Sequence, residues 1–69
     1  MRVTADLVQT HRLEDVELAA GATGMDLLER LGLAPDAHIL LRGDMPIPVD
    51  EPLADGERLI VLSAVSGGT

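Results

Sequence analysis

Few side chains in this 69-residue sequence offer reactive or metal-binding chemistry. Cysteine is absent, which excludes a disulfide, a thiolate metal site and a cysteine nucleophile within the chain. His11 and His38 have no Asp, Glu or Cys at ligand spacing, so we expect solvated surface histidines and no metal site. The acidic pairs Glu14-Asp15 and Asp50-Glu51 have no cleft to act in on so short a chain, and a solvated face is the better interpretation. Catalysis by the chain itself is therefore the least favoured function.

The adjacent glycines Gly67-Gly68 are the feature most open to a chemical interpretation. The sequence LSAVSGGT carries a hydrophobic segment directly into the pair and on to Thr69. Each glycine loses more backbone freedom on ordering than any other residue, so the pair is poor material for a strand or a helix. Two interpretations remain open at this point: a frayed tail without a role, or a chain end that another protein uses.

The charge of the chain is strongly negative, with twelve acidic residues against five arginines and a net charge of -7. Such a balance opposes phosphate backbones and anionic membranes, so we expect no direct nucleic-acid binding and no membrane association. No stretch approaches the ~20 apolar residues of a membrane span, and the first residues, MRVTADLVQ, are charged where a signal peptide needs an apolar run. We expect a soluble, cytoplasmic monomer. The acidity fits either a basic partner or a GC-rich or salt-adapted source.

The first half of the chain predicts a hairpin followed by one helix. Apolar and polar residues alternate over residues 2–9, and again around Val16 and Leu18, which favours two antiparallel strands joined at residues 10–12. Thr23 can cap a helix over residues 23–31, with Asp26 as its capping-box partner. Gly32 is placed to end that helix in a left-handed conformation.

The second half predicts two more strands around an irregular loop. Residues 39–41 read as a third strand, residues 44–56 as a loop with one helical turn near residues 52–54, and residues 58–65 as a nearly continuous apolar last strand. The order favours an α+β fold of the ubiquitin-like β-grasp type, a mixed four- to five-stranded sheet with one covering helix. We assign residues 1–65 to this domain and residues 66–69 to a Gly-Gly tail. The sheet residues expected under the helix are Val3, Ala5, Leu7, Val16, Leu18, Ile39, Leu41, Leu59 and Val61.

Strand parity then predicts an apolar patch on the face away from the helix. Leu40, Ile60 and Leu62 should cluster there, bordered by Arg42 and Arg58. Exposed apolar patches commonly mark partner surfaces, so these five residues form our candidate docking face. The alternative is that the loop of residues 44–56 covers the patch.

Four segments together resemble the small sulfur-carrier proteins of the ubiquitin-like superfamily: the N-terminal hairpin and the phrases TGMDLLERLGL, LADGERL and VLSAVSGG. The ending is most similar to the bacterial carriers for tRNA 2-thiouridine or 2-thioribothymidine and to the archaeal small modifier proteins. It is less similar to the molybdopterin-synthase small subunit, and the thiamine-pathway carrier remains close. Gly24 stands where these carriers usually have an apolar residue, which predicts a less firmly anchored helix start.

The resemblance implies that an activating-enzyme-like adenylyltransferase uses ATP and Mg²⁺ to adenylate Gly68, and that the product becomes a thiocarboxylate. Ser66 and Gly67 would thread into that enzyme, and the two glycines suit a narrow channel that admits backbone without a Cβ. A sulfurtransferase or tRNA thiolase would then take part, and no cofactor would be bound by the chain itself.

Thr69 departs from the family pattern, in which the second glycine is usually last. Three explanations stay open: a processing peptidase removes Thr69, the residue is foreign to the natural chain, or the protein has abandoned carrier chemistry. Three functions likewise stay open, namely a sulfur carrier for tRNA thiolation or thiamine synthesis, a modifier joined through Gly68 to lysines of target proteins, and an interaction module with an inert tail.

Overall fold

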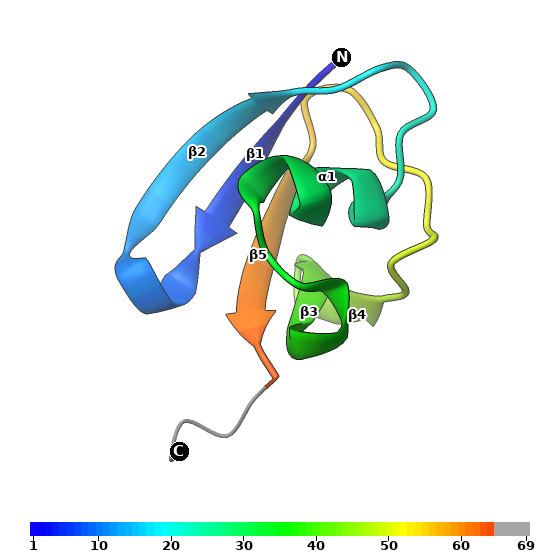
Figure 1. Cartoon of the computed structure of the whole chain (residues 1–69). Coiled ribbons are helices and arrows are strands. Elements are labelled where there is room, and N and C mark those ends of the chain that lie inside the picture. Colours follow the sequence, from blue (N-terminus) through cyan, green and yellow to red (C-terminus); the bar gives the residue numbers. More distant parts are fainter. Residues whose placement is uncertain (65–69) are drawn as a thin grey trace.

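Within residues 1–64, the sheet has five strands in the order β2-β1-β5-β3-β4, and a single α-helix lies across one of its faces (Figure 1). The computed structural model describes residues 1–64. The central strand β5 runs parallel to β1 and antiparallel to β3, which makes the sheet mixed as predicted. The elements are β1 (Arg2–Leu7), a 3-10 turn (Val8–Thr10), β2 (Arg12–Glu17), α1 (Gly24–Leu31), a second 3-10 turn (Pro35–Ala37), β3 (His38–Arg42), β4 (Met45–Ile47) and β5 (Arg58–Ser63).

The first hairpin is antiparallel, and its two strands direct Val3 and Val16 to the same face. The first strand is two residues shorter than predicted, because Val8–Thr10 form a 3-10 turn and His11 adopts a left-handed conformation with φ 55°. The alternating pattern continued into the turn and therefore could not mark where the strand ends.

The helix has the ends that the sequence predicts. The carboxylate of Asp26 accepts a hydrogen bond from the backbone N–H of Thr23 at 2.9 Å, which completes the capping box. Gly32 follows the last turn with φ 76°, where a side chain would be strained. Thr23 is the N-cap, so the helix proper begins at Gly24. Within residues 1–64, no helix combines the length and the hydropathy needed to cross a bilayer.

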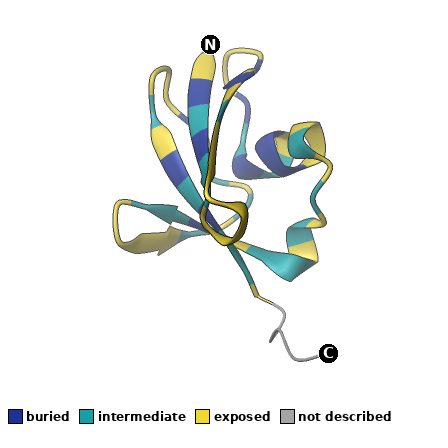
Figure 2. Cartoon of the chain, turned by 90° about the vertical axis from the view of Figure 1, so that its left-hand side faces the viewer, coloured by how far each residue is buried: buried dark blue, intermediate teal, exposed yellow. Residues whose placement is uncertain are grey.

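The core is aliphatic and lies between α1 and the covered face of the sheet. Figure 2 shows the buried residues along the strands and on the helix. Leu27 and Leu28 supply the helix side, and both are completely buried. The remaining buried apolar residues are Val3, Ala5, Val16, Leu18, Ala22, Leu40, Leu53, Leu59 and Val61.

The side chains of strand β3 point to the opposite sheet faces from those predicted. Leu40 pairs with the buried Val61 and is itself completely buried, whereas Ile39 is 41% exposed on the other face. The prediction that Ile39 and Leu41 face the helix is therefore wrong, as is the prediction that Leu40 faces away from it. Three successive apolar residues carry no period-2 signal, and a slip of one residue exchanges the two faces of a strand.

The segment between β3 and β5 is more ordered than predicted. Its first part is strand β4, which forms a hairpin with β3, and the expected helical turn near residues 52–54 is replaced by a bridge between Pro52 and Thr23. The segment is also tied to the helix start, since Gly24 donates to the carbonyl of Glu51 and Met25 to that of Val49.

Gly24 is needed for this contact, so our expectation that it weakens the start of the helix is corrected. It is buried, and a Cβ at this position would overlap the Leu40 side chain and lie 3.2 Å from the carbonyl oxygen of Val49. Only glycine lets the helix start approach β3 and the loop so closely.

Replacing Gly24 with Ala should lower the free energy of unfolding by about 1–3 kcal/mol, the typical cost of overpacking. The measurement is urea unfolding, with Glu29→Ala on the exposed side of α1 as the control. In a Leu40→Val background, which removes the overlapping methyl group, the cost of Gly24→Ala should shrink. An equal cost in both backgrounds would show that the overlap with Leu40 is not its cause.

Candidate partner-docking face

The last strand, β5, lies at the centre of the sheet and leads directly to the predicted tail. Strand β5 is hydrogen-bonded to β1 on one side and to β3 on the other. Beyond its end at Ser63, the N–H of Ala64 donates to the carbonyl of Ala37 at 2.8 Å. The path of the chain is therefore fixed up to residue 64. The predicted strand end at Val65 and the predicted tail residues Ser66, Gly67, Gly68 and Thr69 lie outside the described residues, and the roles assigned to them stay predictions.

Four apolar side chains from β3 and β5 share the sheet face that α1 does not cover. Ile39 lies opposite Leu62, and Leu41 lies opposite Ile60, so the two pairs form adjacent rows. We call these four residues the outer-face patch. Ile39 is exposed and the other three are half-buried. The patch borders the chain exit, because Leu62 precedes Ala64 by two residues.

The patch keeps two of the three apolar residues predicted for it. Ile60 and Leu62 lie on the outer face as predicted. Leu59 and Val61, which alternate with them along β5, are buried on the opposite face. Leu40 belongs to the core and is replaced in the patch by its neighbours Ile39 and Leu41. Sequence reasoning missed these two residues because the run of apolar residues in β3 does not alternate.

Arg58 lies on the same outer face as the patch, directly opposite Thr4 of β1. Its guanidinium is 3.2 Å from the Asp6 carboxylate, and Asp6 is itself the β1 neighbour of Ile60. The Arg58 side chain is 61% exposed. A solvated ion pair of this kind contributes at most about 1 kcal/mol, so Arg58 can exchange Asp6 for a partner carboxylate at little cost.

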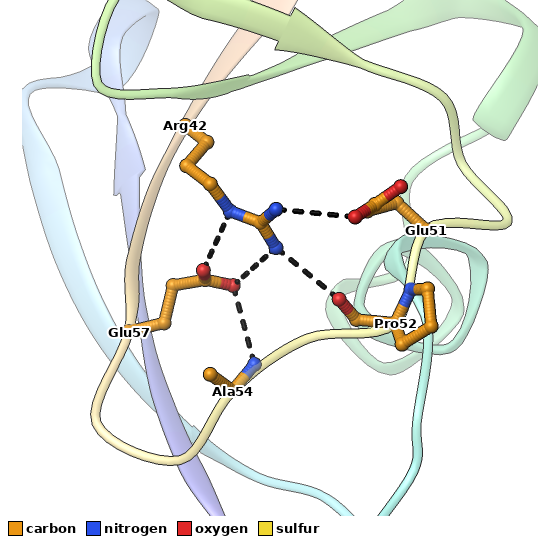
Figure 3. Close-up of polar contacts among 5 residues, drawn as sticks. All are labelled: Arg42, Glu51, Pro52, Ala54 and Glu57. Carbon is orange, nitrogen blue, oxygen red and sulfur yellow. Dashed lines mark hydrogen bonds and ion pairs between the residues drawn. The ribbon is translucent and has the colours of Figure 1, made fainter.

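Arg42 faces the helix side of the sheet, as its pairing with the buried Leu59 requires. Its Nε donates to Glu57 at 2.7 Å, its Nη1 to Glu51 at 3.2 Å and its Nη2 to the carbonyl oxygen of Pro52 at 3.2 Å (Figure 3). The hydrogen bond with Glu57 first, and that with Glu51 second, raise the pKa of Arg42 above its usual value. The prediction that Arg42 borders the patch is therefore wrong.

The contacts of Arg42 have a structural consequence. They hold the loop before β5 against the end of β3, and the same loop carries the two carbonyls that receive the first helix N–H groups. The bidentate contact with Glu57 uses the planar fork of a guanidinium, a geometry that a lysine ammonium cannot reproduce. Arg42 thus positions the loop and the helix start.

Neither histidine lies in a group of metal ligands. Residues 1–64 contain no cluster of three or more His, Asp or Glu side chains arranged to hold a metal ion. His11 is exposed in its turn as predicted. His38 differs from the prediction of a solvated residue, because it is half-buried, its Nδ1 lies 2.8 Å from the carbonyl oxygen of Ala34, and it lines a cavity of about 90 Å³ beside Leu7 and Leu33.

The family model of small archaeal modifier protein 2 matches residues 1–64 of this chain. The sulfur carrier protein TtuB of Thermus thermophilus is 33% identical over 55 residues, which are 80% of this chain and 85% of that protein. An uncharacterized protein of Archaeoglobus fulgidus is 35% identical over 43 residues, which are 62% of this chain and 63% of that protein. The predicted resemblance to carriers and archaeal modifiers is thus confirmed.

Solved structures agree with this relationship. The crystal structure of SAMP1 from Haloferax volcanii superposes with a TM-score of 0.74 at 25% identity and covers 99% of this chain and all of that one, which confirms the predicted β-grasp fold. A chain in the crystal structure of ATBAG1 in complex with HSP70 has a TM-score of 0.76 at 12% identity, with 91% of this chain and 40% of that chain covered, and it shows the fold alone. The sequence match over residues 1–64 and the shared fold together place this chain in the small archaeal modifier protein 2 family of ubiquitin-like proteins.

Proposed function

We propose that this protein is a sulfur carrier for tRNA thiolation. The observation that carries the proposal is the Gly67-Gly68 pair, four and five residues beyond the end of β5. It stands in a chain that matches, over 80% of its length, a relative named a sulfur carrier. The central position of β5 supports this role, because the short tail then follows a strand that is hydrogen-bonded on both sides. Thr69 would be removed by a peptidase, which leaves Gly68 as the reactive end, and the protein would act in the cytoplasm.

The chemistry requires activation by another enzyme, since a free carboxylate is a poor electrophile. An activating-enzyme-like adenylyltransferase would join the Gly68 carboxylate to the α-phosphate of ATP with release of pyrophosphate. The acyl-adenylate has a good leaving group. Sulfide-level sulfur supplied through a sulfurtransferase would bond to the Gly68 carbonyl carbon, the bond from that carbon to the AMP oxygen would break, and AMP would leave with the electron pair to give the thiocarboxylate. ATP and Mg²⁺ would bind to the activating enzyme rather than to this chain.

The outer-face patch and Arg58 are the surface that we propose for docking this enzyme. The patch is apolar, lies next to the chain exit at Ala64 and is flanked by a solvated arginine. These properties suit an interface with an apolar centre and a polar rim. A partner seated there would hold the start of the tail at a defined distance from its own active site.

A second function is favoured by the family match, which is to a modifier protein. In that role Gly68 would be joined by an isopeptide bond to lysines of target proteins after the same adenylation. The remaining carrier alternative is that the protein carries sulfur for thiamine or molybdopterin synthesis. An inert tail would make the protein a plain interaction module.

The pathway can be tested in the source organism by deleting the gene and measuring modified tRNA nucleosides by mass spectrometry. We expect 2-thiouridine or 2-thioribothymidine to fall to background and to return with the wild-type gene, but not with a gene encoding residues 1–66. Normal thiolated nucleosides in the deletion strain would contradict the tRNA assignment. A thiamine or molybdopterin requirement in that strain would then identify the alternative carrier role.

A further inference from the structure

The 69 residues contain no side-chain amine that could accept an activated C-terminus. All five basic residues are arginines, so lysine is absent, and cysteine is absent as well. Guanidinium groups stay protonated at any working pH and do not act as nucleophiles. Serine and threonine hydroxyls are weak nucleophiles unless a base activates them.

Most of the arginines form ion pairs, a role that lysines could partly fill. Four of the five form ion pairs within residues 1–64: Arg2 with Glu17, Arg12 with Glu14, Arg42 with Glu51 and Glu57, and Arg58 with Asp6. The chain therefore keeps its cationic contacts while it offers no ε-amine.

The amino group of Met1 is held in the fold. It donates to the carbonyl oxygen of Leu18 at 2.7 Å and lies 3.3 Å from the Glu17 carboxylate. It also lies far from the chain exit, because β1 and β5 are parallel and Thr4 pairs with Arg58, so Met1 and Ala64 are at opposite ends of the sheet (Figure 1). With a rise of ~3.3 Å per residue, the separation is roughly 30 Å. The four residues that follow Ala64, up to Gly68, can span at most ~14 Å.

We propose that the activated form of this protein cannot acylate itself, either within one chain or between copies, so that each acceptor amine receives a single copy. The inference rests on the proposed activation at Gly68. In the transfer, the acceptor nitrogen bonds to the Gly68 carbonyl carbon, the bond from that carbon to the AMP oxygen breaks, AMP leaves with the electron pair and the nitrogen releases a proton. For a carrier, the same property preserves the acyl-adenylate for the sulfur donor. For a modifier, it excludes chains of this protein built on its own lysines.

The test uses the chain ending at Gly68 as a chemically prepared C-terminal thioester, so that no activating enzyme is needed. Concentrated wild-type thioester at pH 8 should give only the hydrolysed monomer, as measured by intact mass and denaturing gels. Arg30→Lys, on the exposed side of the last helix turn, should give self-linked dimers at least about tenfold faster, with the branch at residue 30. Arg30→Gln is the matched control and should behave as the wild type does.

The state of the Met1 amine is tested by a Gly-Ser extension at the N-terminus, which moves the amine out of the sheet into solvent. We expect the extended chain to form head-to-tail dimers that the wild type does not form. Dimers of wild-type thioester, at the rate seen for Arg30→Lys, would overturn the proposal. That result would leave the activation at Gly68 intact, whereas a failure of ATP-dependent adenylation would contradict the proposed function without changing the thioester result.

Discussion

Deletion of Gly68 and Thr69 together should reduce ATP-dependent adenylation to background and leave the fold unchanged. The sheet, the core and the last described backbone contact, from Ala64 to Ala37, all lie within residues 1–64. Adenylation, in contrast, requires a carboxylate that reaches the active site of the partner. The measurements are pyrophosphate exchange with the activating enzyme and a thermal melt.

Deletion of Thr69 alone is the matched control for this experiment. It places the carboxylate on Gly68, so activation should equal or exceed that of the full chain. If the chain without both residues is activated as well as the chain that ends at Gly68, the carrier interpretation is wrong. If only the full chain is activated, Thr69 itself is the reactive end and the proposed processing is wrong.

Replacing Leu62 with Asp should weaken activation strongly while the protein stays folded. Leu62 lies on the outer face and is half-buried by its neighbours in the patch, so the free energy of unfolding should fall only by about 1 kcal/mol. At the interface, an unpaired carboxylate would be buried against the partner, with a loss on the order of 2–5 kcal/mol. Titration of adenylation against partner concentration measures the loss.

Two further substitutions make this result specific to one face. Val61→Asp buries a charge in the core, where Val61 is 3% exposed, and should unfold the domain, since native domains are typically stable by only about 5–15 kcal/mol. Ile39→Asp, directly opposite Leu62 in the patch, should reproduce the Leu62→Asp loss of activation without unfolding. Full activation of both outer-face variants would remove the patch from the docking surface.

The elements that could be predicted from the sequence are those with a local signal. Thr23 and Asp26 marked the helix start, Gly32 marked its end, and alternation around Val3 and Val16 gave the hairpin. The parity of β5 was also predicted correctly, with Val61 inward and Leu62 outward. Each of these features depends on residues close together in the chain.

The features that could not be predicted depend on tertiary contacts. The face of β3 is set by the pairing of Leu40 with Val61, and three apolar residues in a row give no indication of it. The role of Gly24 follows from the approach of a loop 25 residues later in the chain, at Val49. Arg42 follows the predicted patch residue Leu40 by two positions in the sequence, but its acidic partner Glu57 is brought to it only by the folded loop.

The intact mass of the protein isolated from its source organism tests the central claim most directly. We predict a population that ends at Gly68 and carries one sulfur in place of one carboxylate oxygen. A thiol-alkylating reagent should convert this thiocarboxylate to an S-alkyl thioester and add the mass of one alkyl group, which marks the C-terminus because the chain has no cysteine. Branched Gly-Gly peptides on lysines of other proteins would identify the modifier role in addition. A single species that retains Thr69 and an ordinary carboxylate, under conditions in which tRNA is thiolated, would contradict the account.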